Sequence, residues 1–353
     1  MKAMIAMSGG VDSSVAAYLI QKQGLSCVGA TAQMCDRSIL GDAYTSQGVE
    51  DAKAVADRLG MDFYVFDAVD AFKSAVVEDF IRCYEQGSTP NPCVVCNRQI
   101  KFSYLLDKAL SLGCDYIVTG HYAQIRQDPD TGRFLLYKAK DEAKDQSYFL
   151  ACLNQHQLSH TLFPLGGFTK AQIREMAESQ GFLTAKKKDS QDICFVPDGD
   201  FMGFICRYTG KEYPKGAFLD LQGKPVGSHN GAIRYTLGQR KGLGLAMGEP
   251  VYVCGKDMAC NTVTVGPESA LYTSTLVAED WNWFPFPALT EPMQVMAKAR
   301  SRHIPQPATV YPMENGQAKV VFDTPQRAVT PGQTVVLYQD DMVVGGGTIT
   351  GTY

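Results

Sequence analysis

Apolar and polar positions alternate along residues 1–120 in a pattern that predicts strands and helices in turn. Short apolar strands are expected at Ala3–Ala6, Leu25–Ala32, Phe63–Phe66 and Tyr116–Thr119. Apolar positions recur at helical spacing in Ser13–Gln23, Val49–Leu59, Phe72–Tyr84, Phe102–Leu112 and Lys170–Ser179. Strands that alternate with helices at this spacing indicate a parallel sheet covered on both faces. The polar segment Arg37–Gly48 is expected to be a loop.

The pattern changes after about residue 200, where Gly, Pro and short alternating runs dominate. Such runs predict β-hairpins, and the final stretch suits a small barrel, with Trp281 and Trp283 in its core. We therefore predict an α/β protein with an N-terminal Rossmann-like parallel-sheet domain, a small central domain and a C-terminal antiparallel β-barrel. The predicted boundaries are residues 1–200, 201–274 and 275–353.

Composition narrows the classes of protein. The chain has 353 residues, of which 45% are hydrophobic, and eleven scattered cysteines. An odd number of dispersed cysteines is not a disulfide framework, and no apolar run is long enough for a membrane span. We expect a cytoplasmic protein with reduced thiols and no membrane partner.

The net charge of −4 argues at first against a nucleic-acid partner. Residues 1–70 carry nine acidic and five basic side chains, an excess that equals the whole net charge. Lys224–Gly248 and Pro292–Met313 carry basic residues and no acidic ones. Because binding to phosphates depends on such local fields, the total charge does not exclude RNA.

The segment Ser8–Ser14, called the phosphate loop below, lies between the first predicted strand and helix. Its sequence SGGVDSS combines glycines, which let backbone amides approach an anion, with hydroxyls and a helix N-terminus. It matches neither the Walker loop nor the dinucleotide fingerprint. The alternative is an ordinary glycine turn with a capped helix.

Two cysteine sites lie in segments rich in polar and turn residues. Cys93 and Cys96 follow prolines at a predicted helix N-terminus, and Cys194 follows Lys186–Lys188. The helix dipole and the lysines would each favour a thiolate. Half a zinc site, a thioredoxin-like motif and buried structural cysteine remain alternatives; the last fits Cys27, Cys114 and Cys152 well.

Together these motifs resemble the tRNA-specific 2-thiouridylases, a family of the ATP-pyrophosphatase or PP-loop superfamily. The resemblance runs the length of the chain, through Met7–Val15, Thr89–Phe102, Ala109–Tyr122, Lys144–Phe149, Leu162–Gly166, Lys186–Phe195, Tyr235–Gly244, Ala328–Gln333 and Gly345–Gly347. It implies that ATP adenylates the C2 oxygen of the wobble uridine in a tRNA anticodon. Sulfur then displaces AMP, giving 2-thiouridine, AMP and pyrophosphate.

The resemblance also implies a role for individual residues. Cys194 would carry the incoming sulfur as a persulfide, and Cys96 would be the nucleophile that releases it through a transient disulfide. Magnesium would lie near Asp12, and a cysteine desulfurase or a sulfur-relay protein would supply the sulfur. The implied ATP contacts are Ala6, Met7, Ser8, Gly9, Gly10, Val11, Asp12, Ser13, Ala32 and Gly120. The implied tRNA contacts are Asn91, Pro92, Cys93, His121, Lys144, Asp145, Gln146, Arg300, Ser301 and Gln333.

Two positions depart from the family pattern. Some members have Asp where Cys93 stands; either the proton-transfer role of that Asp is dispensable here, or a thiolate or water fills it. Cys93, Cys96 and Cys194 could alternatively ligate an iron–sulfur cluster, which is not favoured. Members commonly have Tyr where Ser301 stands, and serine cannot stack on RNA as tyrosine does. Two other functions are weighed: a ligase for small molecules, which leaves both cysteines without a role, and a non-catalytic RNA-binding protein, which leaves the phosphate loop unexplained.

Overall fold

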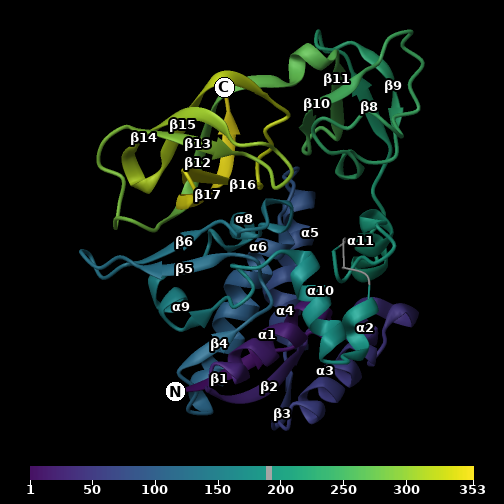
Figure 1. Cartoon of the computed structure of the whole chain (residues 1–353). Helices are drawn as coiled ribbons and strands as arrows, with labels where there is room; N and C mark the ends of the chain where they lie inside the picture. The colour runs from purple at the N-terminus through teal and green to yellow at the C-terminus, as the bar shows by residue number, and fades with distance from the viewer. Residues whose placement is uncertain (188–192) are drawn as a thin grey trace.

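Five parallel strands form the sheet of the N-terminal domain in a computed structural model that describes residues 1–187 and 193–353 (Figure 1). The strands lie in the order β3-β2-β1-β4-β7. Their bounds are β1 Lys2–Ala6, β2 Ser26–Gln33, β3 Phe63–Asp67, β4 Tyr116–Val118 and β7 Thr161–Leu162. The chain builds outward from β1 to β3 and then returns to add β4 on the other side of β1. Such a reversal of strand order opens a crevice at the carboxyl ends of the strands, where α/β proteins bind ligands.

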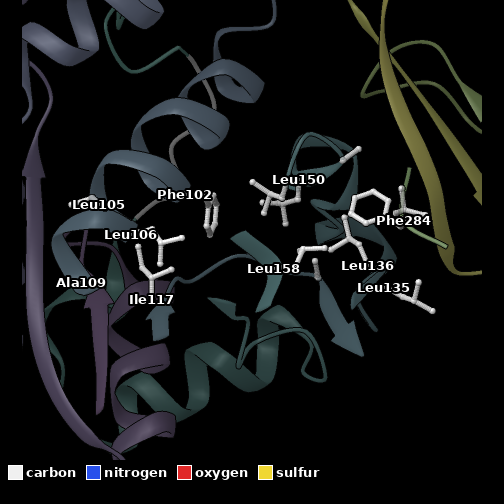
Figure 2. Packing of buried hydrophobic residues seen from close by; sticks show 14 of the residues in the cluster. Phe102, Leu105, Leu106, Ala109, Ile117, Leu135, Leu136, Leu150, Leu158 and Phe284 are labelled. Carbon is white, nitrogen blue, oxygen red and sulfur yellow. The ribbon is translucent and has the colours of Figure 1, made fainter. Parts of the chain in front are cut away.

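Alternate residues of β1 pack into two separate cores, one on each face of the sheet. Ala3 and Ile5 join a cluster with α1 (Val11–Lys22), α3 (Gln47–Arg58) and α10 (Lys170–Ser179). Met4 faces the opposite cluster, which contains Phe102, Leu106 and Ile117 (Figure 2). A strand that is buried on both faces needs apolar residues at consecutive positions, which explains why the sequence of β1 is a continuous apolar run.

The helices depart from the predicted ranges where the backbone winds more loosely. The predicted helix Phe72–Tyr84 is divided into α4 (Val69–Phe72), a π-helical segment (Lys73–Val77) and α5 (Glu78–Glu85). A second π-helical segment, Asn97–Tyr104, joins α6 (Pro92–Cys96) to α7 (Leu105–Ser111). The remaining helices are α8 Ser147–Leu150, α9 Gln155–Ser159 and α11 Phe201–Thr209, with 3₁₀ turns at Gly41–Ala43, Glu142–Lys144, Leu183–Lys186, Ala232–Arg234, Glu268–Leu271 and Glu314–Gly316.

The prediction of a loop over Arg37–Gly48 is wrong in part, because the segment contains α2 (Arg37–Leu40). The Asp36 side chain accepts hydrogen bonds from the backbone N–H groups of Ser38 and Ile39, which caps the helix. Ile39 is buried in the core that also contains Phe72 and Phe195. By contrast, α10 has the predicted bounds, with Thr169 and Gln172 forming a capping box.

The central domain is a small sheet of four strands in the order β10-β11-β8-β9. Their bounds are β8 Gly216–Leu219, β9 Pro225–His229, β10 Tyr252–Asp257 and β11 Thr262–Gly266. Phe218, Val253 and Val263 lie in its core and are fully buried. Figure 1 shows this domain beyond α11, apart from the parallel sheet.

The C-terminal domain is an antiparallel barrel of six strands in the order β12-β15-β14-β13-β16-β17, closed by pairing of β12 with β17. Their bounds are β12 Tyr272–Trp283, β13 Met293–Lys298, β14 Gln306–Pro312, β15 Ala318–Arg327, β16 Thr334–Gln339 and β17 Met342–Thr352. The hairpin of β5 (Gln124–Gln127) and β6 (Phe134–Tyr137) extends the same sheet from the N-terminal domain, through Tyr137 opposite Met342.

Trp281 and Trp283 stack on one another, with ring centroids 4.6 Å apart, and pack against the barrel core as half-buried residues. Their rings lie over the glycines of β17: a Cβ on Gly345 would be 2.7 Å from the Trp283 ring, and one on Gly347 would be 2.7 Å from Trp281. The glycine run of β17 is therefore required by close packing against aromatic rings.

The predicted fold class is confirmed: a parallel-sheet domain, a small central domain and a closed antiparallel barrel. The boundaries at residues 200 and 274 stay predictions. In the described part of the chain, no helix has both the length and the apolar character needed to cross a membrane.

Candidate functional site

A cavity of about 580 Å³ lies at the carboxyl ends of β1, β2 and β4. It is lined by nine of the ten residues for which ATP contact was predicted: Ala6, Met7, Ser8, Gly10, Val11, Asp12, Ser13, Ala32 and Gly120. Residues far apart in the sequence therefore meet at the crevice that the strand order creates. The tenth, Gly9, lies in the same loop and accepts a hydrogen bond on its carbonyl oxygen from Lys187 Nζ at 3.1 Å.

Glycines bring the backbone of the phosphate loop into close contact with its neighbours. Gly9 has a φ of +72°, and a Cβ there would lie 2.3 Å from the carbonyl oxygen of Gly48. A Cβ on Gly120 would lie 2.7 Å from the backbone nitrogen of Ser13. Gly10 is the N-cap of α1 and has no side chain to satisfy the first-turn N–H groups. Those groups and the helix dipole make this end of the cavity an anion site.

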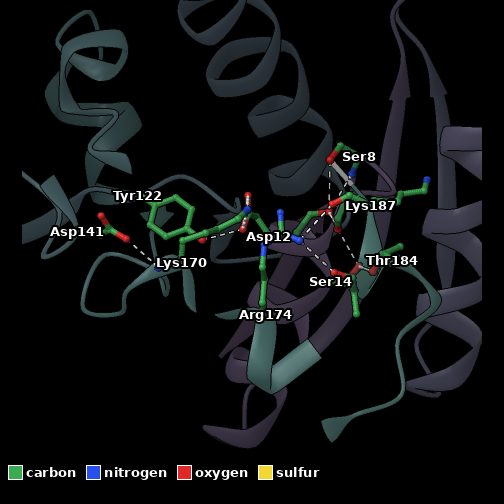
Figure 3. Close-up of polar contacts among 12 residues, drawn as sticks. Ser8, Asp12, Ser14, Tyr122, Asp141, Lys170, Arg174, Thr184 and Lys187 are labelled. Atoms are coloured by element: carbon green, nitrogen blue, oxygen red, sulfur yellow. Dashed lines mark hydrogen bonds and ion pairs between the residues drawn. The ribbon is translucent and has the colours of Figure 1, made fainter. Parts of the chain in front are cut away.

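Asp12, in the first turn of α1, is the centre of a polar network at the base of the cavity (Figure 3). Lys170 Nζ donates to both carboxylate oxygens at 2.8 Å, and the Tyr122 hydroxyl donates to Oδ1 at 2.7 Å. The backbone N–H of Lys170 donates to Asp141 Oδ2 at 2.8 Å. Neither Lys170 nor Tyr122 is marked by a signal in the sequence, because each meets Asp12 only in the folded chain.

Two further contacts fix the phosphate loop to the segment that precedes Cys194. The Ser14 and Thr184 hydroxyls are 3.1 Å apart, and Lys187 forms an ion pair with Asp51 as well as its bond to Gly9. Lys187 therefore faces the loop, whereas the sequence suggested that it acts on Cys194. Residues 188–192 of the predicted cysteine motif lie outside the described residues.

The sequence predicts Cys93 and Cys96 in a loop next to a helix N-terminus, but both lie within α6 itself, Cys93 in its first turn and Cys96 as its last residue. Cys96 is buried, and its Sγ donates to the Met34 sulfur at 3.8 Å. Burial raises the pKa of Cys96 to about 12, against the opposing charge of Lys101. Desolvation also raises the pKa of Cys93, although that residue is partly exposed. The expectation of a thiolate at the helix N-terminus is wrong for this structure, because desolvation outweighs the positive charge.

Cys194 is an exposed residue whose neighbour Phe195 anchors it to a buried aromatic cluster. The Phe195 ring lies 5.2 Å from Phe80 and 5.2 Å from Phe204, centroid to centroid. The influence of the Cys35 side chain, followed by desolvation, raises the pKa of Cys194 well above its usual value. The lysine-rich segment was expected to lower this pKa, and the structure contradicts that expectation.

Lys101 is the cation that the thiols share. Its charge lowers the pKa of Cys93, Cys96 and Cys194 against their burial, and its side chain lines the cavity. Lys101 is five residues beyond Cys96. In an α-helix, two residues at this spacing lie on different faces. Because π-helical turns are hydrogen-bonded between residues five apart, the Asn97–Tyr104 segment brings the two together. The sequence offered no signal for this.

Three residues with predicted tRNA contacts line the cavity: His121, Lys144 and Gln146. His121 is buried, its Nδ1 lies 2.7 Å from the Thr119 hydroxyl, and burial lowers its pKa well below the usual value, so the ring is neutral. Gln146 Oε1 accepts from the Tyr122 backbone N–H at 3.0 Å. Asp145 turns away from this wall, because its carboxylate accepts from the backbone N–H groups of Ala139 and Ser147.

The remaining predicted tRNA contacts lie where the domains meet. Gln333 Nε2 donates to the carbonyl oxygens of Thr89 at 2.9 Å and Pro90 at 3.0 Å, which ties the barrel to the segment before α6. Asn91 is the N-cap of α6 and Pro92 is its buried first residue. A second link joins the barrel to the central domain, through hydrogen bonds from Arg300 to the Leu237 carbonyl and the Thr330 hydroxyl. Ser301 lies in the adjacent turn, half-buried.

Within residues 1–187 and 193–353, no group of three or more His, Cys, Asp or Glu side chains is placed to hold a metal ion. The iron–sulfur alternative thus gains no support from the arrangement of Cys93, Cys96 and Cys194. Magnesium is a different case, because it commonly uses one or two carboxylates together with substrate phosphates. Asp12 supplies one carboxylate next to the anion site, in competition with Lys170.

Known families and proteins are similar to this chain over nearly its whole length. Family models match residues 1–198 (tRNA methyl transferase HUP domain), 202–267 (tRNA methyl transferase PRC-barrel domain) and 273–349 (aminomethyltransferase beta-barrel domain). A tRNA-specific 2-thiouridylase MnmA of Acetivibrio thermocellus is 48% identical over 99% of both chains. The proteins of the same name from Clostridium perfringens and Heliobacterium modesticaldum are 47% and 49% identical, over 98% and 91% of their own lengths and 99% and 98% of this chain. The phosphate loop, the cysteine sites and this full-length similarity agree, and the chain belongs to the tRNA-specific 2-thiouridylase family.

Proposed function

We propose that this chain makes 2-thiouridine in tRNA, by adenylating C2 of the wobble uridine with ATP and then replacing that oxygen with sulfur. The observation that carries the proposal is a cavity lined by the phosphate loop and by Lys101, whose charge also acts on the thiols of Cys96 and Cys194. An amide-like carbonyl is a poor electrophile, and its oxygen leaves only after activation. A phosphate site with thiols close to it can activate the oxygen and deliver sulfur without releasing the intermediate. The thiols favour sulfur transfer over the methyl transfer named in the family-model descriptions.

The phosphate loop is suited to hold the pyrophosphate end of ATP. The first-turn N–H groups of α1, with Ser8 and Ser13, supply neutral donors, and Lys170 and Lys187 supply positive charge nearby. Asp12 would hold Mg²⁺, which neutralises charge on the leaving pyrophosphate when bound. The role of this chain is to position the triphosphate so that the α-phosphorus faces the uridine oxygen.

The sulfur step would use Cys194 as the carrier and Cys96 as the thiol that releases the sulfur. A persulfide on Cys194 loses its terminal sulfur when a thiolate attacks the inner sulfur, and a disulfide remains. Cys93 lies within electrostatic range of both and would take part in moving the proton. Cycling requires reduction of the disulfide, which is consistent with the predicted cytoplasmic location and with sulfur from a cysteine desulfurase or a relay protein.

The tRNA would enter with its anticodon loop directed to the cavity. A single-stranded loop can extrude one base into a pocket, which a stacked duplex cannot do without unstacking. His121, Lys144 and Gln146 lie at the wall where such a base would arrive. Gln333 and Arg300 would support tRNA binding indirectly, by fixing the relative positions of the domains that form the docking surface. Their side chains already form hydrogen bonds between domains.

The test is a complete reaction with unmodified tRNA, ATP, Mg²⁺ and a sulfur donor. We expect 2-thiouridine in the digested tRNA and AMP in equal amount, measured by liquid chromatography with mass spectrometry. The matched control is the same tRNA with the wobble uridine replaced by cytidine, which should yield neither product. Release of ADP instead of AMP would contradict the proposal. Iron is measured in the same preparation, and full activity without iron contradicts the cluster alternative.

A further inference from the structure

Lys101 is a cation in the cavity wall that has no acidic partner. Its side chain is half-buried and lines the cavity. Of the described side chains, none forms a hydrogen bond or an ion pair with its ammonium group. The acidic side chain that lines the same cavity, Asp12, is already bonded by Lys170 and Tyr122. The cavity therefore has a positive charge available to an anionic ligand, and neither the motifs nor the family resemblance assigns Lys101 a role.

Two separate cores fix the backbone on either side of Lys101. Ile100 is buried in the cluster that contains Phe195. Phe102 is fully buried in another cluster, which contains Ile117 (Figure 2). A side chain between two anchored neighbours enters the cavity from a rigid base, as precise placement of a charge requires.

The positive charges reach the cavity from elements on opposite faces of the parallel sheet. The phosphate loop leads into α1, which packs with α10 and its Lys170 on the face that contains Ile5. Lys101 instead precedes Phe102 and α7, which pack on the face of Met4. A phosphate group held between the two sides is neutralised from both.

Lys101 also belongs to the same helical unit as two of the thiols. The π-helical segment Asn97–Tyr104, which carries Lys101, begins directly after Cys96, the last residue of α6. Burial raises the pKa of Cys93 and of Cys96, and the charge of Lys101 opposes both increases. A group bound to Lys101 therefore lies within electrostatic range of the thiols.

We propose that Lys101 is a catalytic residue that binds the phosphate of the adenylated uridine on the side opposite the phosphate loop. In adenylation, the C2 oxygen bonds to the α-phosphorus, pyrophosphate leaves with the electron pair of the broken P–O bond, and the N3 proton passes to water. Hydrosulfide from the Cys194 persulfide then bonds to C2, AMP leaves with the electron pair of the C–O bond, and the hydrosulfide proton moves to N3. The inference rests on the proposed function, because it needs a phosphate linked to C2.

A cation at this phosphate has two effects on the reaction. It neutralises charge on the phosphate oxygens, which helps the C2 oxygen approach the α-phosphorus and later helps AMP leave. It also fixes the position of C2, which is two bonds from the phosphorus, relative to the thiols. Lysine is suited to this role because its ammonium group is a compact point charge that binds phosphate.

The experiment compares wild type, Lys101→Met and Lys101→Arg, with Lys108→Met as a matched control. Lys108 is on α7, its ammonium group lies 5.3 Å from the centroid of the Tyr104 ring, and it is outside the set of described residues that line the cavity. Binding of AMP and of adenosine is measured by calorimetry, without tRNA or a sulfur donor. We expect Lys101→Met to bind AMP about tenfold more weakly and adenosine equally well, because only AMP carries the phosphate. Lys101→Arg keeps the charge and should retain most of the affinity for AMP, and Lys108→Met should match wild type.

A single turnover with ATP, Mg²⁺ and unmodified tRNA gives a second measurement, in which Lys101→Met should release pyrophosphate about tenfold more slowly than wild type. Unchanged AMP binding or an unchanged rate of pyrophosphate release in Lys101→Met would overturn the inference. An equal loss of adenosine binding would also overturn it, because that loss comes from a distorted cavity. A wild type that binds AMP through Lys101 but makes no 2-thiouridine refutes the proposed function, whereas an active enzyme whose Lys101→Met variant binds AMP normally refutes only the inference.

Discussion

The phosphate loop lines the cavity, and the thiol cluster (Cys93, Cys96 and Cys194) lies within electrostatic range of Lys101 on the cavity wall, but the two groups have opposite environments. Asp12 has two hydrogen-bonding partners, Lys170 and Tyr122, and charged groups surround the loop. The thiols lie against an apolar core, and burial raises the pKa of Cys96 to about 12. The phosphate-loop end is thus arranged for charge in advance, whereas burial keeps the Cys96 thiol protonated. The difference suggests that sulfur transfer, and not adenylation, needs a change in the site before it proceeds.

The largest expected effect is the loss of sulfur transfer while adenylation is retained. Cys194→Ser should reduce 2-thiouridine to background, because serine cannot carry a persulfide, while adenylation, followed as pyrophosphate release in a single turnover, continues at a rate within about threefold of wild type. Both products are measured in one reaction, with Cys260→Ser, which alters an exposed thiol in the central domain, as the control. Normal thiolation by Cys194→Ser would show that the carrier is another residue.

The next largest effect is expected from a substitution in the charged network around Asp12. Asp12→Asn removes the ion pair between Asp12 and Lys170, and loss of a hydrogen bond between charged groups should lower kcat/KM for ATP about 10- to 100-fold. Asp341→Asn, which removes a surface partner of Lys138, is the control and should have little effect. An Asp12→Asn enzyme with unchanged ATP kinetics would mean that the network is not part of the nucleotide site.

The rates of sulfur transfer and of adenylation should depend differently on pH. Because the pKa of Cys96 is raised, its reactive thiolate increases about tenfold per pH unit below that pKa, and sulfur transfer should rise between pH 7 and 9. Adenylation uses no thiol in the proposed reaction, so pyrophosphate release should stay nearly flat over the same range. Single-turnover rates of both products against pH test this. Two parallel profiles would contradict the contrast between a charged and a protonated half.

The smallest effect concerns how the barrel supports the thiol side. A Cβ on Gly332, which has a φ of +86°, would lie 3.0 Å from Ser88 Cβ and 3.0 Å from the Thr89 carbonyl oxygen. Gly332→Ala should therefore cost about 1–3 kcal/mol of stability beyond the cost of positive φ. Gly316→Ala is the matched control, with a φ of +74° and no atom within 4 Å of the new Cβ. Equal midpoints of thermal unfolding for both variants would show that Ser88 and Thr89 move aside for the new Cβ without a measurable loss of stability.

Local sequence signals predicted the elements whose determinants are local. The Thr169 capping box sets the start of α10, and the apolar run of β1 specifies a strand buried on both faces. The helix over Phe72–Tyr84 was predicted only in outline, because π-helical winding follows from packing and has no composition of its own. The short helix α2 was missed, since its stability comes from burial of Ile39 against distant residues.

The sequence by itself determined the chemistry available to this protein: a glycine and serine loop for phosphate, thiols for sulfur, and the family to which these motifs belong. Tertiary structure alone decided which groups meet and in what state. Lys170 reaches Asp12 across 158 positions, the charge of Lys101 acts on the thiols of two distant segments, and Gln333 supports the segment before α6. A thiol's pKa depends on desolvation and on charges that neighbours in space supply. The helix and lysine signals in the sequence therefore predicted thiolates where the folded protein holds thiols.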